Sequence, residues 1–221
     1  YTINDGNGGS IDANATLTVN PVNDLPTLTS NKVYLENGTE DIVYSIKATD
    51  LLQGYSDVEG DTLSVKDLTV SSGSGSLTDN QDGTWTFNSP QDFYGDISLT
   101  YLVSDSNGGT INANQSFSLD PVNDAPVSTG DVDFGSIDED SSFTISANDV
   151  IEKLLSTTTD VDGDTLTIDN LKLVEGEGTL TQNIDGSYTF TPAENYNGLI
   201  SGSYTINDGN GGSIDANATL T

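Results

Sequence analysis

A long internal repeat constrains this chain more than any other feature of its sequence. The segment YTINDGNGGSIDANATLT at 1–18 recurs letter for letter at 204–221, and PVNDLP at 21–26 returns as PVNDAP at 121–126. A repeat of about 100 residues is long enough to bury its own core, so it predicts tandem domains. Because the chain opens in mid-pattern, we expect a piece of a longer protein. We assign the last strands of a preceding unit and two complete units to residues 1–20, 21–120 and 121–221.

Within each unit the apolar residues alternate with a period of two. TWTF at 84–87 and SYTF at 187–190 show this alternation, and Asp82-Gly83 and Asp185-Gly186 precede them as turn dipeptides. Short alternating strands separated by turns predict an all-β fold of tandem antiparallel β-sandwiches with about seven strands each, arranged end to end. A stretch at 147–156 has room for one or two helical turns. Six aromatic residues on the strands are predicted to be core: Trp85, Phe87, Tyr101, Tyr188, Phe190 and Tyr204.

The charge balance excludes several classes of function. The chain carries 35 Asp and Glu against five lysines, with no His, Cys or Met and a formal charge of −30. Nucleic acid and anionic membranes would repel such a chain, and no apolar run is long enough to insert into a membrane. The absence of His and Cys removes imidazole bases, thiolate nucleophiles, disulfides and the usual zinc sites. What remains is carboxylate chemistry, including the binding of a hard cation.

Three acidic residues at alternate positions occur twice. The chain reads DVEGD at 57–61 and DVDGD at 160–164, each followed by Thr-Leu. Neither copy is an EF-hand loop, because the Gly at position 6 and the Glu at position 12 are missing. On an extended segment the three carboxylates would point to one side, where they would repel unless a cation lay among them. Calcium is the cation that such an oxygen-rich site favours.

The order of the acidic motifs resembles a known family. ATD and AND precede DVEGD and DVDGD, and DPVNDAP at 120–126 is similar to the linker that joins cadherin domains. The units therefore resemble cadherin-type domains, and more closely the cadherin-like tandem repeats in the extender regions of bacterial RTX-type surface adhesins. The resemblance implies calcium-binding sandwiches whose partners are neighbouring repeats of the same chain. It also implies export to the bacterial cell surface.

The same resemblance implies the calcium ligands. They come from the linkers, from an acidic pair near the start of each unit, from the alternating acids and from the Asp that ends a late strand. For the first unit these are Asn23, Asp24, Glu40, Asp41, Asp57, Glu59, Asp61 and Asp105. For the second they are Asp120, Asn123, Asp124, Glu139, Asp140, Asp160, Asp162, Asp164 and Asp208. Glu59 and Asn20 replace the Asp found in the second unit, so the first site is expected to bind calcium more weakly.

Three other interpretations fit parts of the sequence. The acids could form a solvated surface without metal, two of them could serve a glycosidase, or one sandwich could bind a carbohydrate or other ligand through calcium. The duplication of every acidic motif and the lack of Arg and His argue against an enzyme and its small-molecule substrate. We therefore expect a calcium-rigidified spacer that is not an enzyme.

Overall fold

The computed structural model describes residues 1–221, which divide into two compact units, Tyr1–Leu119 and Asp120–Thr221. The elements of the first unit, in chain order, are β1 (Thr2–Asn4), β2 (Ser10–Asp12), β3 (Thr27–Leu28), β4 (Gly38–Thr39), β5 (Tyr44–Lys47), α1 (Ala48–Leu51), β6 (Tyr55–Ser56), β7 (Ser64–Ser72), β8 (Ser76–Asp79), β9 (Thr84–Asn88), β10 (Gly95–Ser104) and β11 (Thr110–Asp120).

The second unit repeats this order after the initial hairpin. Its elements are β12 (Val127–Ser128), β13 (Val132–Asp133), β14 (Phe143–Ile145), α2 (Ala147–Leu155), β15 (Thr158–Thr159), β16 (Thr167–Glu175), β17 (Gly178–Gln182), β18 (Tyr188–Pro192), β19 (Ile200–Asn207) and β20 (Ser213–Leu220).

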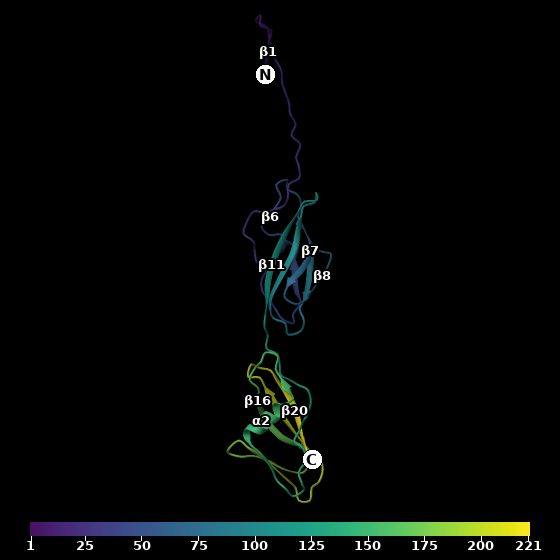
Figure 1. Cartoon of the computed structure of the whole chain (residues 1–221), viewed down its shortest axis with the longest axis vertical. Helices are drawn as coiled ribbons and strands as arrows, with labels where there is room; N and C mark the ends of the chain where they lie inside the picture. Colours follow the sequence, from purple (N-terminus) through teal and green to yellow (C-terminus); the bar gives the residue numbers. More distant parts are fainter. The chain divides into compact units, whose positions relative to one another are not determined.

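Each unit is a sandwich of a four-stranded and a three-stranded sheet. The first unit pairs its strands in the orders β4-β11-β10-β7 and β5-β9-β8, and the second in the orders β13-β20-β19-β16 and β14-β18-β17. Short two-stranded pairs, β3-β6 and β12-β15, complete the units. Figure 1 shows β7, β8 and β11 within the first unit and β16, β20 and α2 within the second. The predicted all-β fold of tandem sandwiches is confirmed.

The pairing of β13 with β20 departs from the antiparallel arrangement that the sequence predicts. β13 pairs with β20 in parallel, with Val132 opposite Ala218 and Asp133 opposite Thr219. The two strands lie near opposite ends of the unit's sequence, so no tight turn forces them to run in opposite directions. The backbone bonds continue beyond the strands, since the amides of Phe134 and Ile137 donate to the carbonyls of Thr219 and Thr221.

The core lies between the two sheets of each unit. Burial alternates along β10 and β19, as strands with one buried face require. Of the six aromatics predicted to be core, five are buried, and Tyr188 is partly buried against the core cluster of the second unit that contains Tyr204. The hydroxyls of Tyr101 and Tyr204 donate to the carbonyls of Leu51 and Leu154, so burial of these rings leaves no polar group unpaired.

The predicted helical stretch forms α2. Its N-cap Ser146 accepts a hydrogen bond from the amide of Asp149, and Val150 and Leu154 face the core. The corresponding helix α1 of the first unit has only four residues. The helix that precedes the DVDGD loop of the second unit is therefore longer than the helix that precedes the DVEGD loop of the first unit.

Residues 1–12 form a hairpin with little burial. β1 and β2 pair in antiparallel register, and all six of their residues are exposed. In the partial unit expected at residues 1–20, the apolar residues Ile3, Ile11, Leu17 and Val19 are all exposed.

Candidate metal centre

A late strand of each sandwich ends on a buried aspartate. β10 ends at Ser104 and β19 at Asn207, and Asp105 and Asp208 follow directly, each 3% exposed. A tight loop then leads into the next strand. In the second unit, Asp208 Oδ1 accepts hydrogen bonds from the amides of Asn210, Gly211 and Gly212 at 2.7–3.0 Å. These bonds hold the carboxylate at the end of the sheet.

The DVDGD loop is a turn, so the extended geometry inferred from its acid spacing is wrong. Asp160 Oδ1 accepts hydrogen bonds from the amides of Asp162 and Asp164, at 3.0 and 3.2 Å. Gly163 has a φ of +76°, which is readily available only to glycine. The first acid therefore folds back on its own loop, and the three carboxylates do not share one side. Asp57, Glu59 and Asp61 make the same two bonds in the first unit.

The turn brings two of its acids to the strand-end aspartate. Carboxylate oxygens of Asp160, Asp164 and Asp208 all lie within 4.8 Å of one another. Asp160 Oδ2 is buried and has no hydrogen-bond partner, so one ligand oxygen is already desolvated and available. Three carboxylates at this spacing suit calcium, which takes six to eight oxygen ligands in loose geometry. The counterparts Asp57, Asp61 and Asp105 do not meet this spacing.

Two asparagines donate hydrogen bonds to acids of this cluster. The side-chain amide of Asn123 donates to Asp208 at 2.8 Å, and that of Asn210 donates to Asp164 at 2.8 Å. Asn123 belongs to the predicted ligand set, whereas Asn210 and its counterpart Asn107 were not predicted. The shared pattern of Asn-Gly-Gly after each strand-end Asp is the sequence signal that could have identified them.

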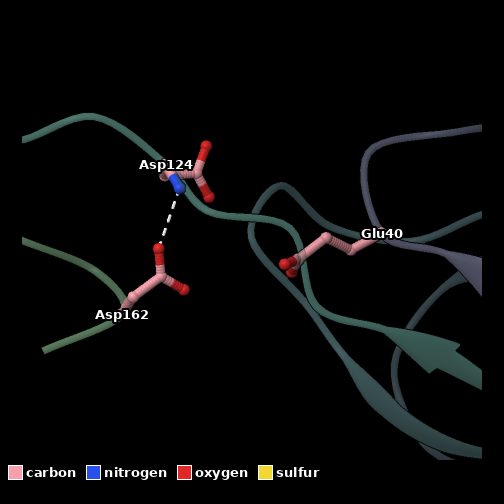
Figure 2. A group of neighbouring side chains, drawn as sticks. All are labelled: Glu40, Asp124 and Asp162. Atoms are coloured by element: carbon pink, nitrogen blue, oxygen red, sulfur yellow. Dashed lines mark hydrogen bonds between the residues drawn. The ribbon is translucent and has the colours of Figure 1, made fainter. Parts of the chain in front are cut away.

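The second acid of each loop contacts the linker and not the aspartate at the end of the late strand. Figure 2 shows the amide nitrogen of Asp124 donating to Asp162 Oδ2, at 2.8 Å. In the first unit the amide of Asp24 donates to Glu59 Oε2 at 3.2 Å, so the longer Glu makes the same contact. Asp162 and Glu59 thus tie each linker to the unit that follows it.

The acidic pairs near the start of each unit lie at the other end of its sandwich. Asp41 Oδ1 accepts the amide of Asp92 at 3.0 Å, and Asp140 Oδ1 accepts the amide of Asn195 at 2.9 Å. β10 begins at Gly95 opposite Leu119, which places Asp92 at the end of the sheet far from Asp105.

The remaining predicted ligands are placed as follows. Glu40, the third residue drawn in Figure 2, is buried, whereas its counterpart Glu139 is exposed. Asp120 is the exposed last residue of β11. Sequence reasoning missed Asp92, whose Oδ1 is buried without a hydrogen-bond partner. Because the second unit has Asn195 at this position, comparison of the two units does not reveal it.

Hydrogen bonds hold the two strand-end aspartates in the ionised form. The side-chain amide of Asn123, opposed by desolvation and assisted by backbone amides, lowers the pKa of Asp208 below its usual 3.8. The side-chain amide of Asn23 lowers the pKa of Asp105 in the same way. Donors directed at a carboxylate stabilise its charged form.

These lowered pKa values predict a loss of stability in acid. As the pH falls through 3.8, the unfolded chain binds protons that the folded aspartates still exclude, so the free energy of unfolding decreases until the folded pKa is passed. We expect melting temperatures measured in chelator to fall steeply below about pH 4. Asp208→Asn should flatten this dependence, whereas Glu152→Gln, an exposed residue on α2, should leave it unchanged. An equal slope in both variants would contradict the prediction.

Both units match the same known family. A model of the cadherin-like domain matches residues 22–120 and again residues 122–221. The chain belongs to the cadherin-like domain family. Cadherin-like domains are generally extracellular, typically have no enzymatic activity and usually bind calcium. The acidic residues described above form groups that could hold such a metal.

Solved structures with similarity to this cadherin-like chain share little sequence with it. The endo-fucoidan hydrolase MfFcnA4 (H294Q variant) is 23% identical over all of this chain and 33% of its own, with a TM-score of 0.36. Mouse cadherin-23 EC22-24 is 17% identical over 90% of this chain and 66% of its own, with a TM-score of 0.45. Human mucin-like protocadherin EC1-2 is 14% identical over 86% and 95%, with a TM-score of 0.40.

The cadherin-like chain spans about a third of the length of the fucoidan hydrolases that it matches. Among curated proteins, none matches the chain. Neither of its helices has the length and apolar character needed to cross a bilayer.

Proposed function

We propose that these cadherin-like units are spacer repeats that calcium stiffens, and that they belong to the extender region of a large bacterial surface adhesin of the RTX type. The observation that carries this proposal is the grouping of Asp160, Asp164 and Asp208 at one end of the second sandwich. Like charges so close together are costly unless a cation lies among them. A cation bound there would hold together the loop, the strand end and, through Asn123 and Asp162, the linker.

The arrangement of acids supports a role in spacing. Each unit carries acidic residues at both ends of its sandwich, and the motifs recur in the same order in both units. Neighbouring repeats are the proposed partners, and the bacterial cell surface is the proposed location. Without calcium the linker acids repel one another, and few other contacts are expected to restrain a linker between domains. With calcium the connection stiffens and the units extend end to end.

Small-angle scattering of the 221-residue chain tests this proposal. We expect the distance distribution to become longer and narrower when calcium replaces chelator, because the connection between the units loses freedom. Two sandwiches in line, with their loops, should measure about 80 Å, an estimate from the rise of roughly 3.3 Å per strand residue.

Matched variants localise the effect. Asp162→Ala removes the acceptor for the amide of Asp124, so the calcium form should scatter like a flexible chain while both units stay folded. Glu59→Ala removes the corresponding acceptor for the linker that precedes the first unit, so it should leave the connection between the two units unchanged. Identical distance distributions with calcium and with chelator, in a folded chain, would refute the proposal.

A further inference from the structure

The core of the second unit contains a cavity between its two sheets. The cavity has a volume of about 70 Å³, and strands of both sheets line it together with α2, through residues that include Ile145, Val150, Leu171, Leu173 and Phe190. Apart from Gly202 and Thr219, every lining residue has an aliphatic or aromatic side chain. Thr219 lies between Ala218 and Leu220, which are both buried, so its side chain points away from the core. The cavity is therefore apolar.

The cavity lies beside Gly202, at a position where the first unit has a leucine. Leu99 on β10 and Gly202 on β19 each lie two residues before the buried tyrosine of their strand, and both face the core. The side chain of Leu99 is 0% exposed, so it fills the first core at this point. The backbone does not require glycine in the second unit, because the φ of Gly202 is not positive.

Space for a side chain is present at Gly202. A Cβ atom placed on this glycine would lie 3.1 Å from the carbonyl oxygen of Lys172, and the next nearest atom, Leu171 Cδ1, would lie 3.9 Å away. Only the carbonyl oxygen is therefore close enough to need a small shift. Without a side chain at Gly202, the core in front of it is left partly empty.

A second core position is also smaller in the second unit. Phe117 on β11 lies opposite Ile97, and Leu220 on β20 lies opposite Ile200, so the two residues occupy the same place in the repeat. Phe117 stacks on Tyr44 with 4.2 Å between the ring centroids. Leucine has no ring to make such a contact. Two side chains that fill the first core are thus shortened in the second.

The lining of the cavity suits an apolar occupant better than water. A buried water needs about two to four polar partners, and this lining presents almost no polar surface. Cavities of roughly 150 Å³ that are lined by Leu, Ile and Phe stay dry and bind benzene or xenon. At about 70 Å³, the cavity of the second unit suits an occupant smaller than benzene. Such an occupant would supply the dispersion contacts that the lining side chains lack.

We propose that the second unit contains an interior binding site for one small apolar molecule of a few heavy atoms, and that Gly202 creates it. The ligand class comprises gases and hydrocarbons without hydrogen-bonding groups. Leu99 occupies the corresponding space in the first unit, so the two repeats differ in this property. No acidic residue lines the cavity, so the site does not depend on the proposed role of calcium.

Xenon is the probe for this site, because it is apolar, polarisable and has no hydrogen-bonding group. The test is solution NMR of the folded 221-residue chain, carrying ¹³C-labelled methyl groups, over a series of xenon pressures. We expect saturable shifts for the methyl groups of Ile145, Leu171 and Leu173, which line the cavity. Leu99 and Val103 in the first core should show none. Helium at the same pressures controls for pressure itself, since it is barely polarisable.

Variants that fill the cavity locate the site. Gly202→Ala places a methyl group in the cavity and should abolish the saturable shifts. Gly130→Ala makes the same change at an exposed glycine whose added Cβ would meet no atom within 4 Å, so it should leave the shifts unchanged. Ala218→Val fills the cavity from the residue opposite Gly202, and it replaces Gly202→Ala if that variant does not fold.

Three results would overturn the proposal. The first is a folded parent chain without saturable shifts in the second core. The second is an equal response of both cores, which would show that xenon binds without regard to the cavity. The third is unchanged xenon affinity in a folded variant whose cavity has been filled.

Discussion

Millimolar calcium should raise the melting temperature of the chelator-treated chain by more than about 10 °C. A ligand that binds only the folded state at 100 times its Kd adds about 2.7 kcal/mol of stability. For a domain of about 100 residues, each kcal/mol corresponds to roughly 4–8 °C. The folded chain offers the grouped carboxylates of Asp160, Asp164 and Asp208, which the unfolded chain does not hold together. Its 35 acids are opposed by only five lysines, so repulsion in the metal-free state is strong.

Ionic strength needs a matched control, because added salt screens surface charges whatever the cation. Potassium chloride at equal ionic strength should recover only a small part of the increase. Magnesium should also fall short, since it dehydrates reluctantly and demands a stricter geometry. Equal melting temperatures in calcium and in chelator would contradict the calcium site itself.

Asp160→Asn should reverse the sign of its effect between calcium and chelator. The amide keeps an oxygen that can accept from Asp162 and Asp164, so the turn is preserved. It replaces Oδ2, which is buried without a partner, by a neutral group that cannot bind a cation. We expect calcium affinity at this site to fall by about 100-fold or more, since even residues behind the ligands change affinity by 10–100-fold. In chelator the variant should be at least as stable as the parent, because one of the repelling charges is gone.

Asp57→Asn is the matched control in the first unit, where Asp57 occupies the same place in the same turn. It should leave calcium binding by the second unit unchanged. Isothermal titration calorimetry and melting curves of both variants, with and without calcium, distinguish the two units. A parallel loss of stability in calcium and in chelator for Asp160→Asn would mean that this side chain serves only the fold.

The fold could largely be predicted from the sequence, because the patterns that specify it are local. Alternation in TWTF and SYTF sets one face of a strand toward the core, and the turn dipeptides end the preceding strands. The burial of the aromatic residues follows from the same alternation. Each of these features depends on residues within a few positions of one another.

The geometry of the candidate metal site could be predicted less well, because it depends on segments that are distant in the sequence. The alternating acids are compatible with an extended strand, and only the fold shows that Asp160 binds its own loop while Asp162 binds the linker. Asn210 meets Asp164 across 46 residues, a contact that no local pattern specifies. The parallel pairing of β13 with β20 is of the same kind, since it joins the two ends of the unit.

That parallel pairing determines how a unit carries a pulling force. β13 lies near the start of the second unit and β20 at its end, so tension applied through the chain pulls these two neighbours in opposite directions along their common axis. Their hydrogen bonds, together with those from Phe134, Ile137 and Thr221, are then loaded in shear and must break together. In an antiparallel pair joined at its tip, the same force would open the bonds one at a time, like a zip. The sandwich therefore places hydrogen bonds that are loaded in shear between the two points at which it is pulled.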